Sequence, residues 1–110
     1  MIEQKTSAEV YDLIKDAGKK NLIDVRTPEE YGEVHAVDAV NVPLDQFVGG
    51  GNVEELLQGI AKDETVYIIC RSGARSMKAA EICEAAGYSQ LVNVSGGTME
   101  WVDSGLPVVK

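Results

Sequence analysis

The stretch TVYIICRSGARS, residues 65 to 76, joins the strongest strand signal of the chain to a sudden change in character. Residues 65–69 are β-branched, aromatic or aliphatic, which is typical of a buried strand. Cys70 follows directly, and the residues after it are polar or small and include Arg71 and Arg75. The stretch therefore predicts a buried strand that ends in a thiol surrounded by positive charge.

Helical and strand-like patterns alternate on both sides of this stretch. Two capping boxes, Thr6–Glu9 and Thr27–Glu30, mark helix starts, because each pairs a threonine hydroxyl and a glutamate carboxylate with free amides. We expect strands at 21–25, 39–43, 65–69 and 91–94, and helices from Thr6 to Gly18, from Thr27, from Asn52 to Ala61, after the Cys70 loop to Gly87, and within 95–105.

Strands that alternate with helices pair in parallel and are covered by helices on both faces. The chain is therefore predicted to be α/β, a doubly wound and mainly parallel sheet with helices on both faces. Its 110 residues suit one domain, spanning residues 1–110.

Composition and charge limit the classes of partner. Acidic residues outnumber basic ones 18 to 10, so the net charge is -8, and we expect neither nucleic acid nor an anionic membrane as a partner. The first ten residues lack the basic start and apolar core of a signal peptide, which predicts a cytoplasmic protein. Two cysteines and one histidine are too few for a zinc site, so we expect no metal and no cofactor.

The predicted topology places Cys70 at the carboxyl end of a strand, where open α/β sheets bind ligands. The amides at the start of the following helix form an anion cradle, and Ser72, Gly73 and Ala74 are small enough for the backbone to curl around a bound group. The cradle and the two arginines favour the thiolate, so the pKa of Cys70 should be lowered. The loop therefore indicates covalent catalysis on an anion, the alternative being an inert cysteine at a strand end.

Three motifs resemble those of one known family. CRSGARS, residues 70–76, resembles the active-site loop of the rhodanese family of sulfurtransferases. LIDVRTPEEYGEVHAVDAVNVP, residues 22–43, resembles the amino-terminal signature of that family, and VNVSGGTMEWVDSGLPV, residues 92–108, resembles its carboxyl-terminal signature. Together they cover nearly the whole chain and imply the small, single-domain rhodanese-like form.

The resemblance implies a sulfurtransferase in which Cys70 carries a sulfane sulfur as a persulfide. The implied donor is a small anion such as thiosulfate, and the implied acceptor is cyanide, a thiol or a sulfur-acceptor protein. The substrate-binding loop implied by the resemblance consists of Arg71, Ser72, Gly73, Ala74, Arg75 and Ser76. In this interpretation Arg75 faces the bound anion and Arg71 lies at the loop mouth, although each could instead be a solvated charge.

Four further residues have a structural and a functional interpretation. Asp24 and Arg26 could be an acid–base pair, but an ion pair that fixes the loops after the first strand is the interpretation we favour. Cys83 lies on the apolar stripe of a helix and is expected in the core, with a resolving thiol for Cys70 as the alternative. His35 is expected to be structural.

The chain departs from the family pattern in one turn. The family usually has glycine at the positions of Val34 and Asp38, and isoleucine at that of Ala36. Because this turn lies away from the cysteine loop, the changes concern local geometry.

Three other functions compete with sulfur transfer by a stand-alone enzyme. A sulfur-relay module that passes persulfide sulfur to a partner fits every residue above. A cysteine phosphatase fits less well, because its loop has five residues between cysteine and arginine, whereas four separate Cys70 from Arg75. A non-catalytic module of the same fold would usually have lost the cysteine.

Overall fold

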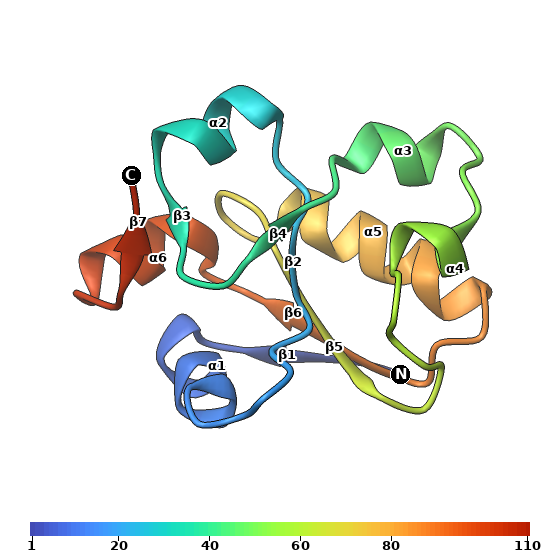
Figure 1. Ribbon diagram of the computed structural model, residues 1–110, viewed down its shortest axis with the longest axis horizontal. Coiled ribbons are helices and arrows are strands. Elements are labelled where there is room, and N and C mark those ends of the chain that lie inside the picture. Colours follow the sequence, from blue (N-terminus) through green and yellow to red (C-terminus); the bar gives the residue numbers. More distant parts are fainter.

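A computed structural model describes residues 1–110, and its centre is a parallel sheet of five strands in the order β1-β6-β5-β2-β4 (Figure 1). These strands are β1 (Ile2–Lys5), β2 (Leu22–Asp24), β4 (Val40–Asn41), β5 (Thr65–Ile69) and β6 (Gln90–Val94). All four pairings are parallel, and β5 lies in the middle of the sheet. A separate antiparallel ribbon joins β3 (His35–Ala36) to β7 (Val108–Val109).

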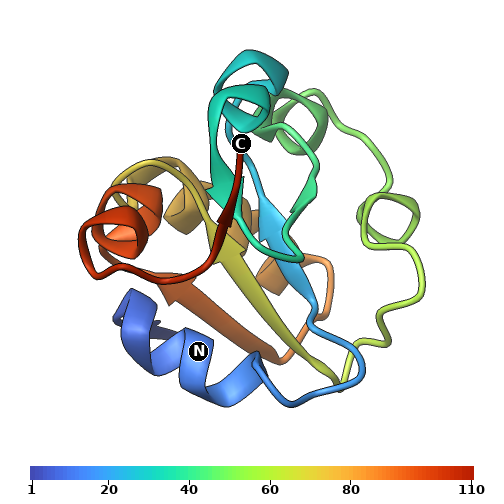
Figure 2. The ribbon, with the colours of Figure 1, turned by 60° about the vertical axis from the view of Figure 1, so that its left-hand side comes forward.

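Helices cover both faces of the sheet (Figures 1 and 2). One face carries α1 (Ser7–Ile14) and α6 (Gly97–Asp103), and the other carries α3 (Leu44–Val48), α4 (Val53–Leu56) and α5 (Ala74–Ala85). The remaining helix, α2 (Pro28–Glu33), follows β2 and lies beyond the carboxyl ends of the strands, near the loop after β5 (Figure 1). The doubly wound α/β architecture is thus confirmed. None of the helices is long and apolar enough to cross a bilayer.

The alternation of side chains along β5 divides the core in two. Val66, Ile68 and Cys70 belong to the apolar cluster under α3, α4 and α5, which also contains Cys83. Ile69 points to the opposite face and belongs to the cluster under α1 and α6, which includes Trp101. Successive residues of a strand face opposite sides of the sheet, so the Cys70 side chain lies on the side covered by α5, together with Val66 and Ile68.

Both predicted capping boxes are present. The Thr6 hydroxyl accepts from the Glu9 amide at 3.1 Å, and the Thr27 hydroxyl accepts from the Glu30 amide at 3.3 Å. The glutamate carboxylates reach back to the threonine amides at 2.8 and 3.2 Å. The second box matters for the site, because Glu30 also binds a residue of the cysteine loop.

The structure adds elements that the sequence patterns did not predict: β1, α3 and the ribbon of β3 with β7. Strand β1 is partly exposed and is defined by its backbone pairing to β6, with Ile2 opposite Leu91. Such an edge strand carries little hydrophobic signal of its own.

Two predicted helices are shorter than expected. Helix α1 ends at Ile14 rather than near Gly18. Helix α4 ends at Leu56 rather than at Ala61, because Leu57 leaves helical geometry and Gly59 adopts a φ of +77°. Leu57 is nonetheless fully buried, so its apolar side chain serves the core from a turn.

The residues that depart from the family pattern fit their local geometry. Asp38 has a φ of +67°, a region where glycine is least strained and where aspartate is better tolerated than most residues. Val34 is extended, with φ -163°, and Ala36 is fully buried. The turn therefore forms without the usual glycines.

Candidate active site

Cys70 lies where β5 ends, and its side chain is almost completely buried, with 1% of its surface exposed. Arg71, Ser72 and Gly73 form the loop that leads into α5, whose first residue is Ala74. Gly73 caps this helix in the left-handed region, with φ +103°. A side chain there would collide with the backbone of Ser95, so only glycine lets the loop close this tightly.

The loop surrounds Cys70 Sγ with hydrogen-bond donors. The Gly73 amide donates to Sγ at 3.1 Å, and the Ser76 hydroxyl lies 3.3 Å from Sγ. Burial raises the pKa of Cys70, but the hydroxyl of Ser76 and the amides of Ser76, Gly73 and Ser72 outweigh burial and lower the pKa below its ordinary value. The loop is thus an anion cradle centred on the sulfur.

The first turn of α6 holds this loop from outside. The Thr98 amide and hydroxyl both donate to the Cys70 carbonyl, at 2.8 and 3.0 Å, and the Met99 amide donates to the Arg71 carbonyl at 3.1 Å. Gly97, with φ +62°, touches the Arg71 carbonyl so closely that a Cβ would not fit. The Gly-Gly pair of the carboxyl-terminal motif therefore allows α6 to clamp the cysteine loop.

Trp101 fixes the position of α6. Its indole is fully buried, donates to the Pro107 carbonyl at 2.8 Å and packs edge-on against Tyr11 with ring centroids 5.8 Å apart. Trp101 thus supports the contact of α6 with the cysteine loop.

Arg75 is engaged by Glu30 of α2. Its guanidinium forms two hydrogen bonds to the Glu30 carboxylate, at 2.7 and 2.9 Å. This pairing, opposed by partial burial, lowers the pKa of Glu30 to about 2. The groups that lower the pKa of Cys70 most are the Ser76 hydroxyl and the amides of Ser76, Gly73 and Ser72. Arg75 also attracts the charge of Cys70, but this contribution is smaller.

The predicted ion pair between Asp24 and Arg26 is confirmed. Both side chains are buried, and Arg26 Nη2 lies 2.9 Å from Asp24 Oδ2. The same nitrogen donates to the Val34 carbonyl at 2.6 Å, while the Asn41 amide group donates to the carbonyls of Asp24 and Arg26, both at 3.0 Å. This network joins the end of β2 to the segments before β3 and at β4, which matches the structural interpretation.

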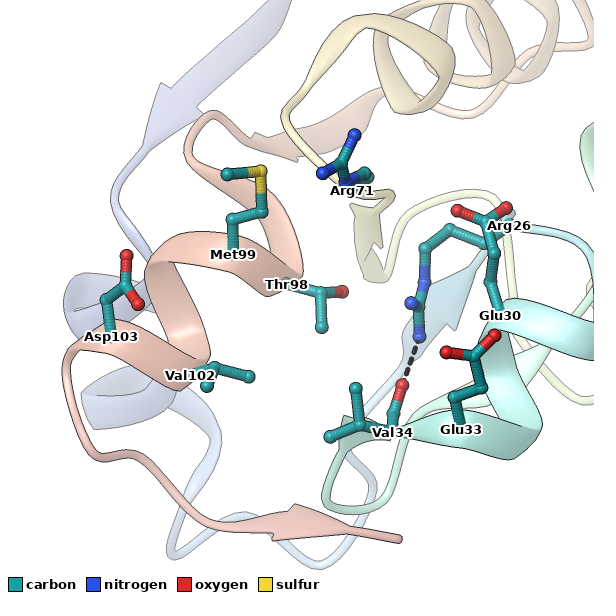
Figure 3. Close-up of a pocket in the computed structure, with 9 residues that line it drawn as sticks. All are labelled: Arg26, Glu30, Glu33, Val34, Arg71, Thr98, Met99, Val102 and Asp103. Atoms are coloured by element: carbon teal, nitrogen blue, oxygen red, sulfur yellow. Dashed lines mark hydrogen bonds between the residues drawn. The ribbon is translucent and has the colours of Figure 1, made fainter.

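A groove of about 340 Å³ lies beside the cysteine loop (Figure 3). Met99 and Val102 of α6 form one side, and Glu33 and Val34 form the other, with Arg71 at the end nearest the loop (Figure 3). Its remaining lining residues are Arg26, Glu30, Thr98 and Asp103. Ser72 and Arg71 are both exposed, and Arg71 forms no ion pair, so its charge is free to attract an anion.

Cys83 and His35 have structural surroundings. Cys83 is fully buried in α5, and burial raises its pKa to about 12. A thiol of that kind is a poor nucleophile, which favours its interpretation as a core residue. His35 stacks on the Tyr31 ring with centroids 3.6 Å apart, and its Nδ1 lies 2.7 Å from the Tyr31 carbonyl.

The sequence does not predict the roles of three residues at the site. Glu30 was identified only as a helix cap, and Thr98 only as part of a motif. Asn93, in β6, was treated as one residue of an apolar strand, although a polar residue between Val92 and Val94 was a visible signal. It is 3% exposed and bonds both Ser76 and Gly73.

The fold and the loop together define an α/β domain with an activated cysteine at the carboxyl edge of its sheet. Residues 6–104 match the family described as Rhodanese-like domain. The chain therefore belongs to the rhodanese-like family of sulfurtransferases. No group of three or more His, Cys, Asp or Glu side chains is placed to hold a metal ion.

Two relatives and one solved structure match this chain over most of both lengths. The chain is 32% identical over 109 residues to a protein of Allochromatium vinosum named Sulfurtransferase, covering 99% of this chain and 96% of that one. It is 34% identical over 103 residues to Thiosulfate sulfurtransferase 16, chloroplastic, of Arabidopsis thaliana, covering 88% and 84%. The crystal structure of a Rhodanese-like Domain Protein from Staphylococcus aureus superposes with a TM-score of 0.77 at 31% identity, covering 98% and 99%.

Gly97→Ala tests the clamp of α6 on the loop. Gly97 and Gly105 have similar φ values, +62° and +72°, but only Gly97 lacks room for a methyl group. We expect Gly105→Ala to cost about 1 kcal/mol of unfolding free energy from backbone strain, and Gly97→Ala about 3 kcal/mol because overlap adds to strain. Urea unfolding of both variants measures the difference, and equal losses would contradict the clamp.

Alkylation of Cys70 tests the cradle. We expect the rate of iodoacetamide labelling at Cys70 to have a midpoint below the roughly 8.5 of a free thiol. Ser76→Ala should raise that midpoint, because the thiolate loses a donor. Ser72→Ala should leave it unchanged, since Ser72 contributes only its amide. Intact mass with peptide mapping, from pH 5 to pH 10, separates Cys70 from Cys83; an unshifted Ser76→Ala midpoint would contradict this account.

The Glu30–Arg75 pair predicts an acid-dependent stability. A carboxyl pKa lowered from 4.5 to about 2 stabilises the folded state above pH 4.5, and this contribution is lost as the pH falls toward 2. Glu30→Gln should therefore reduce the pH dependence of the unfolding free energy between pH 4.5 and 2. Glu29→Gln, at an exposed neighbouring position, is the control. The prediction fails if both variants follow the unmutated protein across this window.

Proposed function

We propose that the protein transfers a sulfane sulfur from a small anionic donor such as thiosulfate to a thiol or cyanide, through a persulfide on Cys70. The observation that carries the proposal is the buried sulfur of Cys70 inside a ring of donors, with an amide at 3.1 Å and a hydroxyl at 3.3 Å. These groups stabilise the thiolate relative to the thiol, and the thiolate is the reactive form of cysteine.

The first half-reaction forms the persulfide. The Cys70 thiolate attacks the outer sulfur of thiosulfate, and the sulfur–sulfur bond of the donor breaks as the new one forms. The bonding pair leaves with sulfite, so the persulfide retains one negative charge on its outer sulfur. Arg71, whose charge is free at the end of the groove, would attract the dianionic donor.

The second half-reaction returns the thiolate. An acceptor thiolate or cyanide attacks the outer sulfur, the persulfide bond breaks, and its electron pair remains on Cys70 Sγ. The groove beside Arg71 offers the approach, with apolar side chains of Met99 and Val102 along one wall. A protein acceptor would present its thiol by the same route, so a relay role uses the same chemistry.

We also propose that the protein acts in the cytoplasm. Both of its cysteines are free thiols, which fits the reducing conditions of that compartment.

A cysteine phosphatase is less suited to the loop, because a phosphoryl group must place three equatorial oxygens where the cradle encloses one sulfur atom.

Intact mass after incubation with thiosulfate tests this function. We expect one added sulfur atom in the unmutated protein and none in Cys70→Ser. Cys83→Ala should accept sulfur normally, with about 1 kcal/mol of stability lost from the small cavity. Sulfite and p-nitrophenol release, measured side by side with thiosulfate and p-nitrophenyl phosphate, decides between transferase and phosphatase. Phosphate ester hydrolysis without persulfide formation would overturn the proposal.

A further inference from the structure

Asn93 is a buried polar side chain near the carboxyl end of β6, next to the cysteine loop. It lies in β6 between Val92 and Val94 and is only 3% exposed. Every polar atom of its carboxamide is used: Nδ2 donates to the Gly73 carbonyl at 3.1 Å and to Gln4 Oε1 at 2.9 Å, and Oδ1 accepts from the Ser76 hydroxyl. Burial of such a group in a strand core is costly unless it is fully bonded.

The orientation of this carboxamide is fixed by Gly73. A backbone carbonyl can only accept a hydrogen bond, so the side of Asn93 that faces the Gly73 carbonyl must be its nitrogen. The oxygen of Asn93 therefore faces Ser76. Since Oδ1 has no hydrogen, the bond between these two residues exists only while the Ser76 hydroxyl hydrogen points to Asn93.

The Ser76 hydroxyl thus has one hydrogen and two acceptors. Its oxygen lies 3.3 Å from Cys70 Sγ and closer still to Asn93 Oδ1. A neutral Cys70 thiol can donate to Ser76 while Ser76 donates to Asn93, so all three groups are satisfied. A thiolate cannot donate, and when the Ser76 hydrogen turns to it, two oxygens remain in close contact without a hydrogen between them.

We propose that Asn93 is a positioning residue that acts on Cys70 through Ser76. While Cys70 Sγ is neutral, Asn93 Oδ1 accepts the Ser76 hydroxyl hydrogen. This hydrogen turns to Sγ only when the sulfur is charged. Asn93 therefore opposes the thiolate and favours any step that removes charge from Sγ. In the persulfide the charge lies on the outer sulfur, Sγ is neutral, and the hydroxyl hydrogen returns to Asn93. This last consequence rests on the proposed sulfur transfer, whereas the competition for the hydrogen rests only on ionisation of Cys70.

The decisive variant is Asn93→Leu, which has the same branching at Cγ and no acceptor. Without Asn93 Oδ1, the Ser76 hydroxyl hydrogen is free to bind Cys70 Sγ. The midpoint of iodoacetamide labelling should therefore fall by roughly one pH unit, which corresponds to about tenfold more thiolate at a pH well below the midpoint. Gln4→Leu removes the other side-chain partner of Asn93 and leaves Oδ1 in place, so its midpoint should stay unchanged.

The direction of the shift separates this role from simple support of the loop. If Asn93 served only to hold the Gly73 carbonyl, its loss would loosen the cradle and raise the midpoint. The double variant adds a second criterion, because Asn93→Leu should have no effect on the midpoint in a Ser76→Ala background. A raised or unchanged midpoint in the single variant, or an equal shift in both backgrounds, would overturn the proposal.

The unmutated protein gives a test that does not depend on how the leucine variant folds. The side-chain amide signals of Asn93 in nuclear magnetic resonance should shift with the same midpoint as Cys70 labelling, and the shift should be largely lost in Ser76→Ala. Asn93 signals that do not respond at that midpoint would overturn the proposal. Neither measurement uses a sulfur donor, so a failure of thiosulfate turnover leaves both tests intact.

Discussion

The cradle depends on hydrogen bonds that hold carbonyl groups away from the sulfur. In a trans peptide the carbonyl and the following amide point in opposite directions, so fixing one fixes the other. The Met99 amide binds the Arg71 carbonyl at 3.1 Å, and the Ser72 amide of the same peptide unit is consequently turned toward Cys70. Asn93 holds the Gly73 carbonyl at 3.1 Å from the other side. The first turn of α6 and the carboxyl end of β6 therefore help to determine the inner surface of a loop to which neither belongs.

Helix α2 supplies Glu30, whose carboxylate pairs with the guanidinium of Arg75. Glu30 closes the capping box of α2 and at the same time takes both terminal nitrogens of Arg75. Arg75 therefore joins two segments, and its attraction for the charge of Cys70 is smaller than the effect of the cradle donors. Arg71, which forms no ion pair, lies at the groove (Figure 3). The donors that stabilise the thiolate are the Ser76 hydroxyl and the loop amides.

The sequence predicts the parts of the fold whose signal is local. Capping boxes, the β-branched run of 65–69 and the glycine after α5 each determine their own element, and the three motifs identify the loop. What it does not predict depends on distant partners. Strand β1 is defined by pairing to β6, nearly ninety residues away, and the apolar run to Ala61 continues through a turn because Leu57 is needed in the core. Likewise, Asn93 and Glu30 acquire roles at the site only when the chain brings them to Ser76 and Arg75.

A comparison of Cys70 with Cys83 shows how the loop changes the pKa of a buried thiol. Both are buried thiols in the same apolar cluster, with 1% and 0% of their surfaces exposed. At Cys83 burial acts alone and raises the pKa from 9.0 to about 12, or about 4 kcal/mol against the thiolate. Burial raises the pKa of Cys70 as well, but the amides and the Ser76 hydroxyl lower it by more than burial raises it. A cysteine in this fold therefore needs no exposed position to have a lowered pKa, because its thiolate is stabilised by donors that the surrounding elements hold in place.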